Sequence, residues 1–402
     1  MNILIDANTL YQKDCGSKTY TYNILRELLA IARSEAEIDI CDISGKIIPL
    51  ASVEQLDEIA YKKNRGNFLT ELKKSIPQDS FFYPYVKSFY RNIKNGINRI
   101  HIYSKSKKGK TYDIFFTPYQ MEISPNIAKR KFITIHDIYA LTQPENYLTK
   151  SYTLSFKKYL ETYLRFFDAV LTISEFSKNE IAEHFNYPKN KIFVVHAGFD
   201  RKNYKKLETD GDFSSAEEFK QKYGLKKPYL LYVGVLEPRK NILNLLKAYK
   251  ELRNGGNYFD FDLILVSGSS ALASETFKLI EELKPDVKIF KGVSNEDLNF
   301  FYNCADLFVF PSLYEGFGIP PLEAFSCGTP VAASNATSIP EICGNGAYYF
   351  DPRSVESIKN AISDILGSPS LKSNLIENGS KIAEIYSFRN SAVEILNIFK
   401  KF

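Results

Sequence analysis

The stretch around residue 310 limits the possible folds more than any other part of the sequence. Residues 307–310 form an apolar run short enough for a buried strand, and a Pro-Ser pair ends it. A loop with two glycines and two prolines follows, and residues 322–327 continue as a helix that Gly328 stops. A second apolar strand is expected at 331–333. This order is typical of an α/β sheet with parallel strands.

A glycine loop between a parallel strand and a helix is a place where phosphorylated ligands bind. The free N–H groups of the helix start lie beside the carboxyl end of the strand, where open α/β sheets hold such ligands. Glu315 and Glu323 flank this turn. Because a carboxylate repels phosphate, each is expected to face the uncharged hydroxyls of a sugar or ribose. The plainer alternative is that Glu315 is a solvated loop acid and Glu323 a partner of the helix dipole.

Length and composition favour a two-domain globular enzyme. A chain of 402 residues exceeds a usual single domain, and 44% hydrophobic with 25% charged residues argues against global disorder. The sequence begins at once with an apolar strand and has no apolar run long enough to span a bilayer, so we expect neither a secretory signal nor a membrane helix. We therefore expect a cytoplasmic protein, soluble or peripheral at the inner face of the cell membrane.

The cysteines point to the same compartment. There are five, an odd number, and they are scattered without C-x-x-C spacing. This pattern predicts reduced thiols in the cytosol and argues against a structural zinc site. No metal site is predicted elsewhere in the chain.

Residues 62–110 hold much of the positive charge. The segment has thirteen Lys and Arg residues against two acidic ones, whereas the net charge of the whole chain is +5. Aromatic residues lie among these charges, a combination that suits an anionic membrane surface or a pyrophosphate-linked lipid. A solvated helical hairpin with a few core aromatics is the alternative. Nucleic acid is not expected as a partner, because no recognisable binding module accompanies the segment.

The first half of the chain has the order of a doubly wound domain. A strand at 2–6, a turn that contains Gly16 and an amphipathic helix at 19–32 open it. Further strands are expected at 113–117, 131–135, 169–173 and 191–195. His136 and Asp137 come directly after one of these strands, at the sheet edge that binds ligands. A lone histidine in such a place is more often structural than catalytic, and Asp137 is expected to hold a backbone group or the imidazole.

Two other residues follow strands of the first half. Ser174 is expected to cap the helix that begins at residue 175. His196 follows the strand at 191–195, and no pattern in the sequence assigns it a role.

The second half begins again at residue 228. Residues 201–227 are polar and charged, and we interpret them as the linker and its surroundings. A strand at 229–233 ends at Gly234, and Arg239 with Lys240 precedes the next helix. These cations could neutralise a diphosphate, Arg by its planar fork and Lys by its compact charge. An isolated Arg-Lys pair is, however, more often solvated surface.

Three motifs together resemble those of family 4 of the retaining GT-B glycosyltransferases. The strongest runs from Glu315 to Glu323 as Glu-Gly-Phe-Gly-Ile-Pro-Pro-Leu-Glu, continues as Ala-Phe-Ser-Cys-Gly-Thr-Pro-Val, and matches the Glu-x7-Glu signature of the family. Tyr-Val-Gly-x-x-x-Pro-Arg-Lys-Asn at 232–241 resembles its phosphate-binding segment, and Thr-Ile-His-Asp-Ile at 134–138 resembles its His-Asp motif. The resemblance covers nearly all of the second half and leaves residues 51–110 unmatched.

The resemblance implies a donor site in the second domain. Glu315 and His136 would contact the donor sugar and act in catalysis, and Glu323 would bind the ribose of the nucleotide. Val293 would lie near the base, and the turn with Gly16 would approach the diphosphate. The implied donor-binding residues are Gly16, Gly234, Arg239, Lys240, Val293, Glu315, Gly316, Phe317, Gly318, Ile319 and Glu323.

The resemblance also implies an α/β GT-B fold, with two Rossmann-like doubly wound domains facing across a cleft. The acceptor-side domain would comprise residues 1–205 and a C-terminal helix at about 386–402 that packs back on it, and the nucleotide-sugar-binding domain residues 206–385.

The implied activity is retaining, metal-independent transfer of a hexose of the mannose or glucose type. The donor would be a GDP- or UDP-linked sugar with no further cofactor. The acceptor would be an oligosaccharide or a lipid-linked chain, part of a growing surface polysaccharide or glycolipid. The alternatives are a nucleotide-sugar epimerase of the same architecture and a catalytically silent glycan- or nucleotide-binding scaffold.

Overall fold

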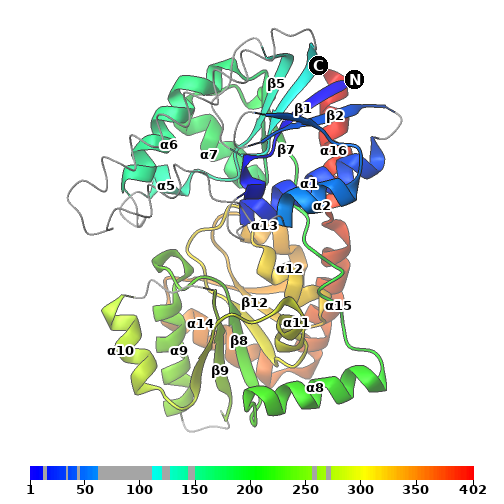
Figure 1. Ribbon diagram of the computed structural model, residues 1–402. Helices are drawn as coiled ribbons and strands as arrows, with labels where there is room; N and C mark the ends of the chain where they lie inside the picture. Colours follow the sequence, from blue (N-terminus) through cyan, green and yellow to red (C-terminus); the bar gives the residue numbers. More distant parts are fainter. Residues whose placement is uncertain are drawn as a thin grey trace, which may run out of the picture.

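The computed structural model describes two parallel sheets, each flanked by helices (Figure 1). We call the parts of the chain around them the first and the second domain. The described residues are 1–11, 16–32, 35–42, 46–61, 111–119, 127–143, 150–255, 260–268 and 273–402. The basic aromatic segment at 62–110 lies outside them.

The first domain carries a seven-stranded sheet. Its strands are β1 (Asn2–Asp6), β2 (Glu37–Cys41), β3 (Ile47–Pro49), β4 (Tyr112–Thr117), β5 (Ala128–Thr134), β6 (Ala169–Thr172) and β7 (Ile192–Val194). They lie in the order β3-β2-β1-β4-β5-β6-β7, and only β3 is antiparallel to its neighbour. The helical segments are η1 (Asn8–Tyr11), α1 (Gly16–Ile31), α2 (Val53–Tyr61), α5 (Tyr139–Thr142), α6 (Lys150–Tyr163), η3 (Leu164–Phe166), α7 (Glu175–Phe185) and η4 (Lys189–Lys191).

The second domain carries a six-stranded sheet. Its strands are β8 (Tyr229–Val233), β9 (Asp262–Val266), β10 (Val287–Phe290), β11 (Leu307–Phe310), β12 (Val331–Ser334) and β13 (Ala347–Phe350). They are all parallel, in the order β10-β9-β8-β11-β12-β13. The helical segments are α8 (Asp210–Tyr223), η5 (Pro238–Lys240), α9 (Ile242–Asn254), α10 (Ser274–Glu282), α11 (Asn295–Asn303), α12 (Ile319–Ser326), α13 (Ile339–Cys343), η6 (Gly344–Gly346), α14 (Val355–Gly367) and α15 (Pro369–Ile385). The last helix, α16 (Phe388–Lys401), belongs to the first domain.

The strands predicted from apolar runs are confirmed with small shifts of their ends. Every residue of β8, β9, β11 and β12 is buried, as expected for parallel strands covered on both faces. The prediction missed β2, β3 and β13. In β2 the acidic Asp39 interrupts the apolar pattern, yet it is buried because its carboxylate accepts a hydrogen bond from the Tyr112 hydroxyl at 2.5 Å.

The interpretation of residues 201–227 as linker is corrected by α8. This helix packs on the second domain through Phe219, whose ring centroid lies 4.8 Å from that of Phe301. The sequence pattern does not reveal this helix, because α8 is charged on its exposed side and its few apolar residues do not form a long run.

The chain crosses between the two domains twice, and the two crossings lie side by side. It first crosses after β7, near Gly198, and returns between α15 and α16, at Phe388. There α16 packs on the first sheet, with the Phe399 ring 4.8 Å from Phe132 and 5.4 Å from Phe116 (Figure 1). The crossings touch, because a Cβ atom added to Gly198 would lie only 2.0 Å from the backbone nitrogen of Phe388.

We expect Gly198→Ala to lower the free energy of unfolding by about 3 kcal/mol, because the added methyl group would clash with backbone atoms of Phe388, which cannot move as a flexible side chain would. The chain has no tryptophan, so urea unfolding is best followed by far-UV circular dichroism. Gly211→Ala is the matched control: Gly211 is exposed in α8, and the nearest atom to its added Cβ is 3.8 Å away. Equal stability of the two variants would contradict the contact between the crossings.

Candidate active site

The order of the second sheet brings two loops together. β8 and β11 are neighbours, although β9 and β10 lie between them in the sequence. The chain leaves β8 toward one edge of the sheet and β11 toward the other, which creates the crevice where open α/β sheets bind ligands. Arg239 and Lys240 follow β8, and Glu315 follows β11. The topology therefore places these predicted site residues side by side.

Glu315 lies between the two cations. Its Oε1 accepts hydrogen bonds from Lys240 Nζ at 2.5 Å and Ser312 Oγ at 2.7 Å. Its Oε2 accepts one from Arg239 Nη1 at 2.9 Å. The partners of Glu315 in this structure are thus two cations and a protein hydroxyl, whereas the sequence predicted sugar hydroxyls. Its contact with the donor sugar stays a prediction.

The cluster of Arg239, Lys240 and Glu315 is a buried ionic unit. Only 9% of the Glu315 side chain and 10% of the Lys240 side chain are exposed. Burial raises the pKa of the Glu315 carboxyl group, but the nearby charges of Lys240 and Arg239 overcome this effect and lower the pKa to about 2. Loss of Glu315 would leave Lys240 as an uncompensated charge in the interior, so the cluster depends on this carboxylate.

Arg239 is held from three sides. Its Nε lies 2.6 Å from Glu237 Oε1, and its Nη1 also donates to the Tyr314 carbonyl at 3.1 Å. The guanidinium carbon lies 5.6 Å from the ring centroid of Tyr139, which belongs to the first domain. The orientation of Arg239 is therefore fixed by both domains.

The glycine loop lies where the domains meet. Gly318 has φ +107°, a conformation that favours glycine, and it precedes α12. A Cβ atom on Gly316 would lie 2.8 Å from Asp137 Oδ2, and Ser174 Oγ donates to the Gly316 carbonyl at 2.8 Å. Because Asp137 and Ser174 belong to the first domain, the absence of a side chain at Gly316 permits this close approach.

The start of α12 offers fewer N–H groups than predicted. Pro320 and Pro321 occupy its first turn and carry no backbone donor. The N–H groups near this turn come instead from residues such as Phe317 and Ile319. A diphosphate at this loop would therefore depend more strongly on the two cations.

Glu323, on α12, points to a pair of tyrosines. The Tyr302 hydroxyl donates to Glu323 Oε2 at 2.7 Å. Burial raises the pKa of Glu323 to about 7, although hydrogen bonds from Tyr302 and Tyr204 act in the opposite direction. Glu323 therefore changes its charge near neutral pH, and its predicted contact with ribose stays a prediction.

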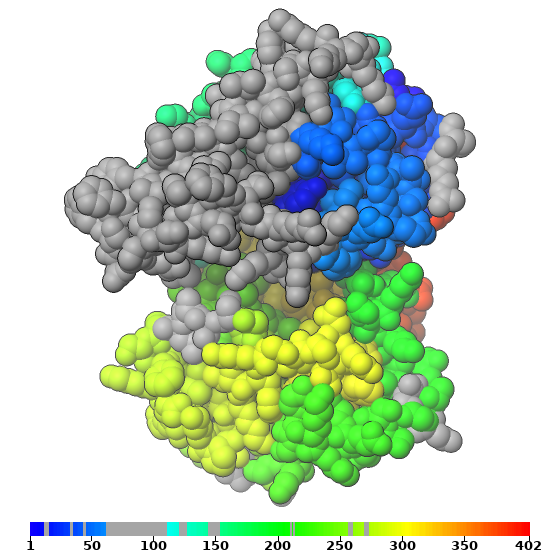
Figure 2. All heavy atoms as spheres, in the orientation of Figure 1, coloured from blue at the N-terminus to red at the C-terminus, as the bar shows by residue number. Residues whose placement is uncertain are grey.

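His136 faces the cluster from the first domain. It lines a cavity of about 250 Å³ together with Asp137 and Tyr139 of the first domain and Glu237 and Arg239 of the second. Figure 2 shows that the molecule narrows to a waist where the two domains meet. The structure thus brings His136 and Arg239 into one cavity.

The imidazole of His136 is neutral at pH 7. Burial lowers its pKa to about 4. Its Nε2 lies 3.3 Å from the Pro118 carbonyl, which can only accept, so Nε2 carries the proton. The Tyr20 ring packs edge-on against it, with centroids 4.5 Å apart. Asp137 holds a backbone group, one of its two predicted roles, since its Oδ1 accepts from Tyr139 N at 3.1 Å.

The remaining predicted donor residues lie at strand ends and helix starts. Gly234 follows β8 with φ +151°, and an added Cβ would lie 2.7 Å from the Tyr232 hydroxyl oxygen. Gly16 begins α1, and residues 12–15 before it lie outside the described part. Val293 lies between β10 and α11, half-buried against the core. Their roles at the donor stay predictions.

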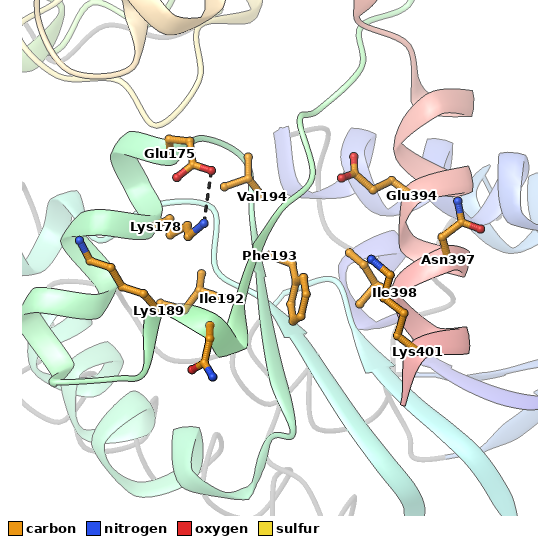
Figure 3. A pocket seen from close by; sticks show the side chains of 11 residues that line it. Glu175, Lys178, Lys189, Ile192, Phe193, Val194, Glu394, Asn397, Ile398 and Lys401 are labelled. Carbon is orange, nitrogen blue, oxygen red and sulfur yellow. Dashed lines mark hydrogen bonds and ion pairs between the residues drawn. The ribbon is translucent and has the colours of Figure 1, made fainter.

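A larger hollow of about 530 Å³ lies between α7, β7 and α16 (Figure 3). Its lining includes Glu175, Lys178 and Lys401, but none of the predicted donor residues. Within the described ranges, no three His, Cys, Asp or Glu side chains are grouped closely enough to hold a metal ion. In the same ranges, no helix combines the length and the apolar character needed to cross a bilayer.

Sequence reasoning missed several side chains that support the site. Glu237 and Ser312 each lie within three positions of a residue that was identified, and a search for nearby polar partners could have found them. Tyr302 is 21 positions from Glu323 in the sequence, so only the packing of α11 on α12 reveals it. Ser338 Oγ donates to the carbonyls of Glu315 and Phe317, which are 23 and 21 positions away in the sequence.

Comparison with known families gives two matches. The family described as "Glycosyl transferases group 1" matches residues 215–382, and "Glycosyltransferase Family 4" matches residues 74–203. The chain is 35% identical over 294 residues to the O-antigen chain mannosyltransferase B of Escherichia coli, an alignment that covers 71% of this chain and 72% of that protein. It is 31% identical over 241 residues to the O-antigen chain mannosyltransferase RfbU of Salmonella typhimurium, covering 60% of this chain and 62% of that protein.

Solved structures support the fold. A sucrose-phosphate synthase from Thermosynechococcus elongatus superposes with a TM-score of 0.67 over 100% of this chain and 98% of its own, at 18% identity. At this identity the likeness shows the fold alone. It confirms the predicted α/β fold of the GT-B type.

We expect Glu315→Gln to lower the free energy of unfolding at pH 7 by about 3 kcal/mol, because Lys240 is left buried with a neutral partner. The pKa of Glu315 is depressed on folding, so the stability that it adds is present above its ordinary value of 4.5 and is lost as the pH falls toward 2. The difference between wild type and variant, measured by urea unfolding, should therefore shrink over that window.

Glu237→Gln is the matched control for this experiment. Glu237 also pairs with Arg239, but 24% of its side chain is exposed, so its removal should cost less than about 1 kcal/mol. Equal losses in free energy of unfolding for the two variants would contradict the conclusion that Glu315 is the carboxylate that compensates the buried cations.

Proposed function

Because this chain belongs to the family of glycosyl transferases group 1, we propose that it transfers a mannosyl residue from a nucleotide diphosphate sugar to a growing polysaccharide. The observation that carries the proposal is the cluster of Arg239, Lys240 and Glu315, which joins the loops after β8 and β11. The relatives that are named O-antigen chain mannosyltransferases support mannose as the sugar and a polysaccharide as the acceptor.

The two cations suit the departure of a nucleoside diphosphate. Negative charge grows on the diphosphate as the glycosidic bond breaks, and Arg239 and Lys240 can stabilise it. Glu315 holds both cations in place, so little reorganisation is needed when this charge develops. The transfer that we propose is metal-independent, because these two fixed cationic groups would stabilise the leaving diphosphate as a bound metal ion otherwise would.

His136 and Glu315 would orient the donor sugar from opposite domains. A neutral imidazole adds no positive charge beside a sugar that becomes cationic in the transition state, which favours an orienting role over charge stabilisation. Closure of the cavity between His136 and Arg239 would exclude water from the reacting carbon. In keeping with the family resemblance, we propose that the anomeric configuration is retained.

The acceptor that we propose is lipid-linked and lies at the inner face of the cell membrane. The basic and aromatic residues of 62–110 support this placement by their composition. The enzyme would then be cytoplasmic and peripheral. The donor would be linked to GDP or UDP, and no further cofactor would take part.

A screen of GDP-, UDP- and dTDP-linked sugars, in buffer with EDTA and with a mannan oligosaccharide as acceptor, tests the proposal. We expect release of nucleoside diphosphate and an elongated oligosaccharide with a mannose donor, and NMR of the product should show retention. Arg239→Ala should lower kcat/KM about a hundredfold or more, since one charge-stabilising group is lost. Arg353→Ala, at an exposed position beyond β13, is the matched control and should leave the rate unchanged.

Other outcomes of the screen identify other functions. Interconversion of the donor sugars without an acceptor would indicate an epimerase. Neither reaction with any donor would indicate a binding scaffold. Turnover that appears only when EDTA is replaced by a divalent cation would contradict the metal-independent mechanism.

Glu323 predicts a pH dependence of donor binding. Its pKa is raised to about 7, so below that pH it is protonated and accepts hydrogen bonds from ribose less well. The KM for the donor should therefore rise as the pH falls, up to about tenfold between pH 8 and pH 6 for a single proton. A nucleotide sugar is the suitable probe, since its diphosphate does not titrate in this range.

Two variants test the assignment to Glu323. Glu323→Gln should remove the pH dependence of KM, because the amide does not ionise. Tyr302→Phe removes a hydrogen bond that lowers the pKa, so it should move the midpoint to higher pH. A pH dependence that persists in Glu323→Gln would assign the titration to another group.

A further inference from the structure

The start of α7, in the first domain, is held by a carboxylate of the second domain. Glu341 Oε1 accepts a hydrogen bond from the backbone N–H of Glu175 at 2.8 Å, and its Oε2 accepts one from that of Phe176 at 3.2 Å. Figure 3 shows Glu175 at this end of α7, below loops of the second domain. Glu341 lies on α13, so the contact joins the domains directly.

Glu341 completes the cap of α7. The first N–H groups of a helix have no partner within it. Ser174 accepts from the N–H of Ser177 at 3.1 Å, as predicted for an N-cap, which leaves the N–H groups of Glu175 and Phe176. An anion at a helix start also interacts favourably with the helix dipole. The first domain therefore presents a binding place that the carboxylate of Glu341 occupies.

The same contact gives His196 a role that the sequence did not assign. Its Nε2 lies 3.0 Å from Glu341 Oε1. Burial raises the pKa of the Glu341 carboxyl group, but the hydrogen bonds from His196 and the two amides outweigh burial and lower it. The ring of His196 also approaches Phe317 of the glycine loop, with centroids 6.2 Å apart. Glu341 is thus an anion shared by three donors of the first domain.

The other end of this connection is the loop that carries Glu315. Just before α13, Ser338 Oγ donates to the carbonyls of Glu315 at 2.9 Å and Phe317 at 3.1 Å. Thr337 Oγ1 accepts from Glu315 N at 3.0 Å, and Thr337 holds φ +56°, which is uncommon for a β-branched residue. The residues before α13 therefore fix the backbone of Glu315.

Three segments consequently form a closed set of contacts. The residues before α13 hold the 315–317 loop, Glu341 of α13 holds the start of α7, and Ser174 at that start donates to Gly316 O in the loop. Ser174 and Ser338 are both fully buried, so their hydrogen bonds are not shared with solvent. Opening the domains would break the contacts of Glu341 and Ser174 together.

We propose that Glu341 is a positioning residue that couples closure of the two domains to the placement of Glu315. It acts through α7 and the glycine loop and does not contact the substrate. The catalytic consequence rests on the proposed function: the donor binds mainly to the second domain in either state, and transfer requires the closed one.

Kinetics of the full chain test the proposal. With GDP-mannose and a mannan oligosaccharide, Glu341→Ala should lower kcat about tenfold, as expected for hydrogen bonds to a charged group, and change the KM for the donor less than about threefold. Glu356→Ala is the matched control, because Glu356 also lies in the first turn of a helix of the second domain but is exposed. It should leave both constants unchanged. An unchanged kcat in Glu341→Ala would overturn the proposal.

A double-mutant cycle separates positioning from a merely structural role. If closure is the shared event, Ser174→Ala and Glu341→Ala should each lower kcat, and the double variant should be little slower than the slower single one. The losses in free energy of unfolding should be more nearly additive than the effects on kcat, because Ser174→Ala also removes the N-cap of α7. Fully additive effects on log kcat would overturn the coupling.

Small-angle scattering provides a readout that needs no substrate. Without donor, Glu341→Ala should have a larger radius of gyration than Glu356→Ala, because its domains separate more often. Both variants are measured at a temperature at which they are fully folded. If no donor turns over, the proposed function fails while this comparison still tests the contact. Identical scattering curves for the two variants would show that Glu341 does not hold the domains together.

Discussion

The ion pairs of Glu315 with Arg239 and Lys240 are the contacts on which the site depends. Charges with so little exposure are tolerated in a protein interior only when they are paired, so the loops after β8 and β11 must keep a fixed distance. The sheet order makes this possible, because it places those two strands side by side. The sheet order therefore brings the two loops together, and the ion pairs fix the distance between them.

The loop that supplies Glu315 is also the loop that meets the first domain. Its neighbour Gly316 accepts a hydrogen bond from Ser174 and lies against Asp137. Arg239, in turn, lies over the ring of Tyr139. The chemistry that we propose for this glycosyltransferase and the contact between its domains thus involve the same few residues. A change in how the domains meet is expected to reach the cluster through backbone contacts, without a long path through the core.

The sequence predicted what lies close together in the chain and missed what packing brings together. Buried parallel strands were readable because their residues are continuously apolar, as in β8, and the motif from Glu315 to Glu323 stood out through its glycines, prolines and acids. β2 was missed because the buried Asp39 breaks the apolar pattern. Contacts such as that of Tyr302 with Glu323 join residues from different elements, so no spacing reveals them. Residues 62–110 lie outside the described structure, and their proposed role still rests on composition.

The carboxylates around the cations explain how the proposed site would be both stable and able to stabilise a leaving group. Arg239 and Lys240 are balanced by Glu315 and Glu237, so the four side chains together carry no net charge. Attraction by net charge is therefore a weak account of how a diphosphate would be held here. Orientation is the stronger account, since each cation is already fixed by its carboxylate and its positive group need not be reorganised as charge develops on the leaving group. A free Arg-Lys pair would attract phosphate more strongly, but it would have to be ordered during the reaction.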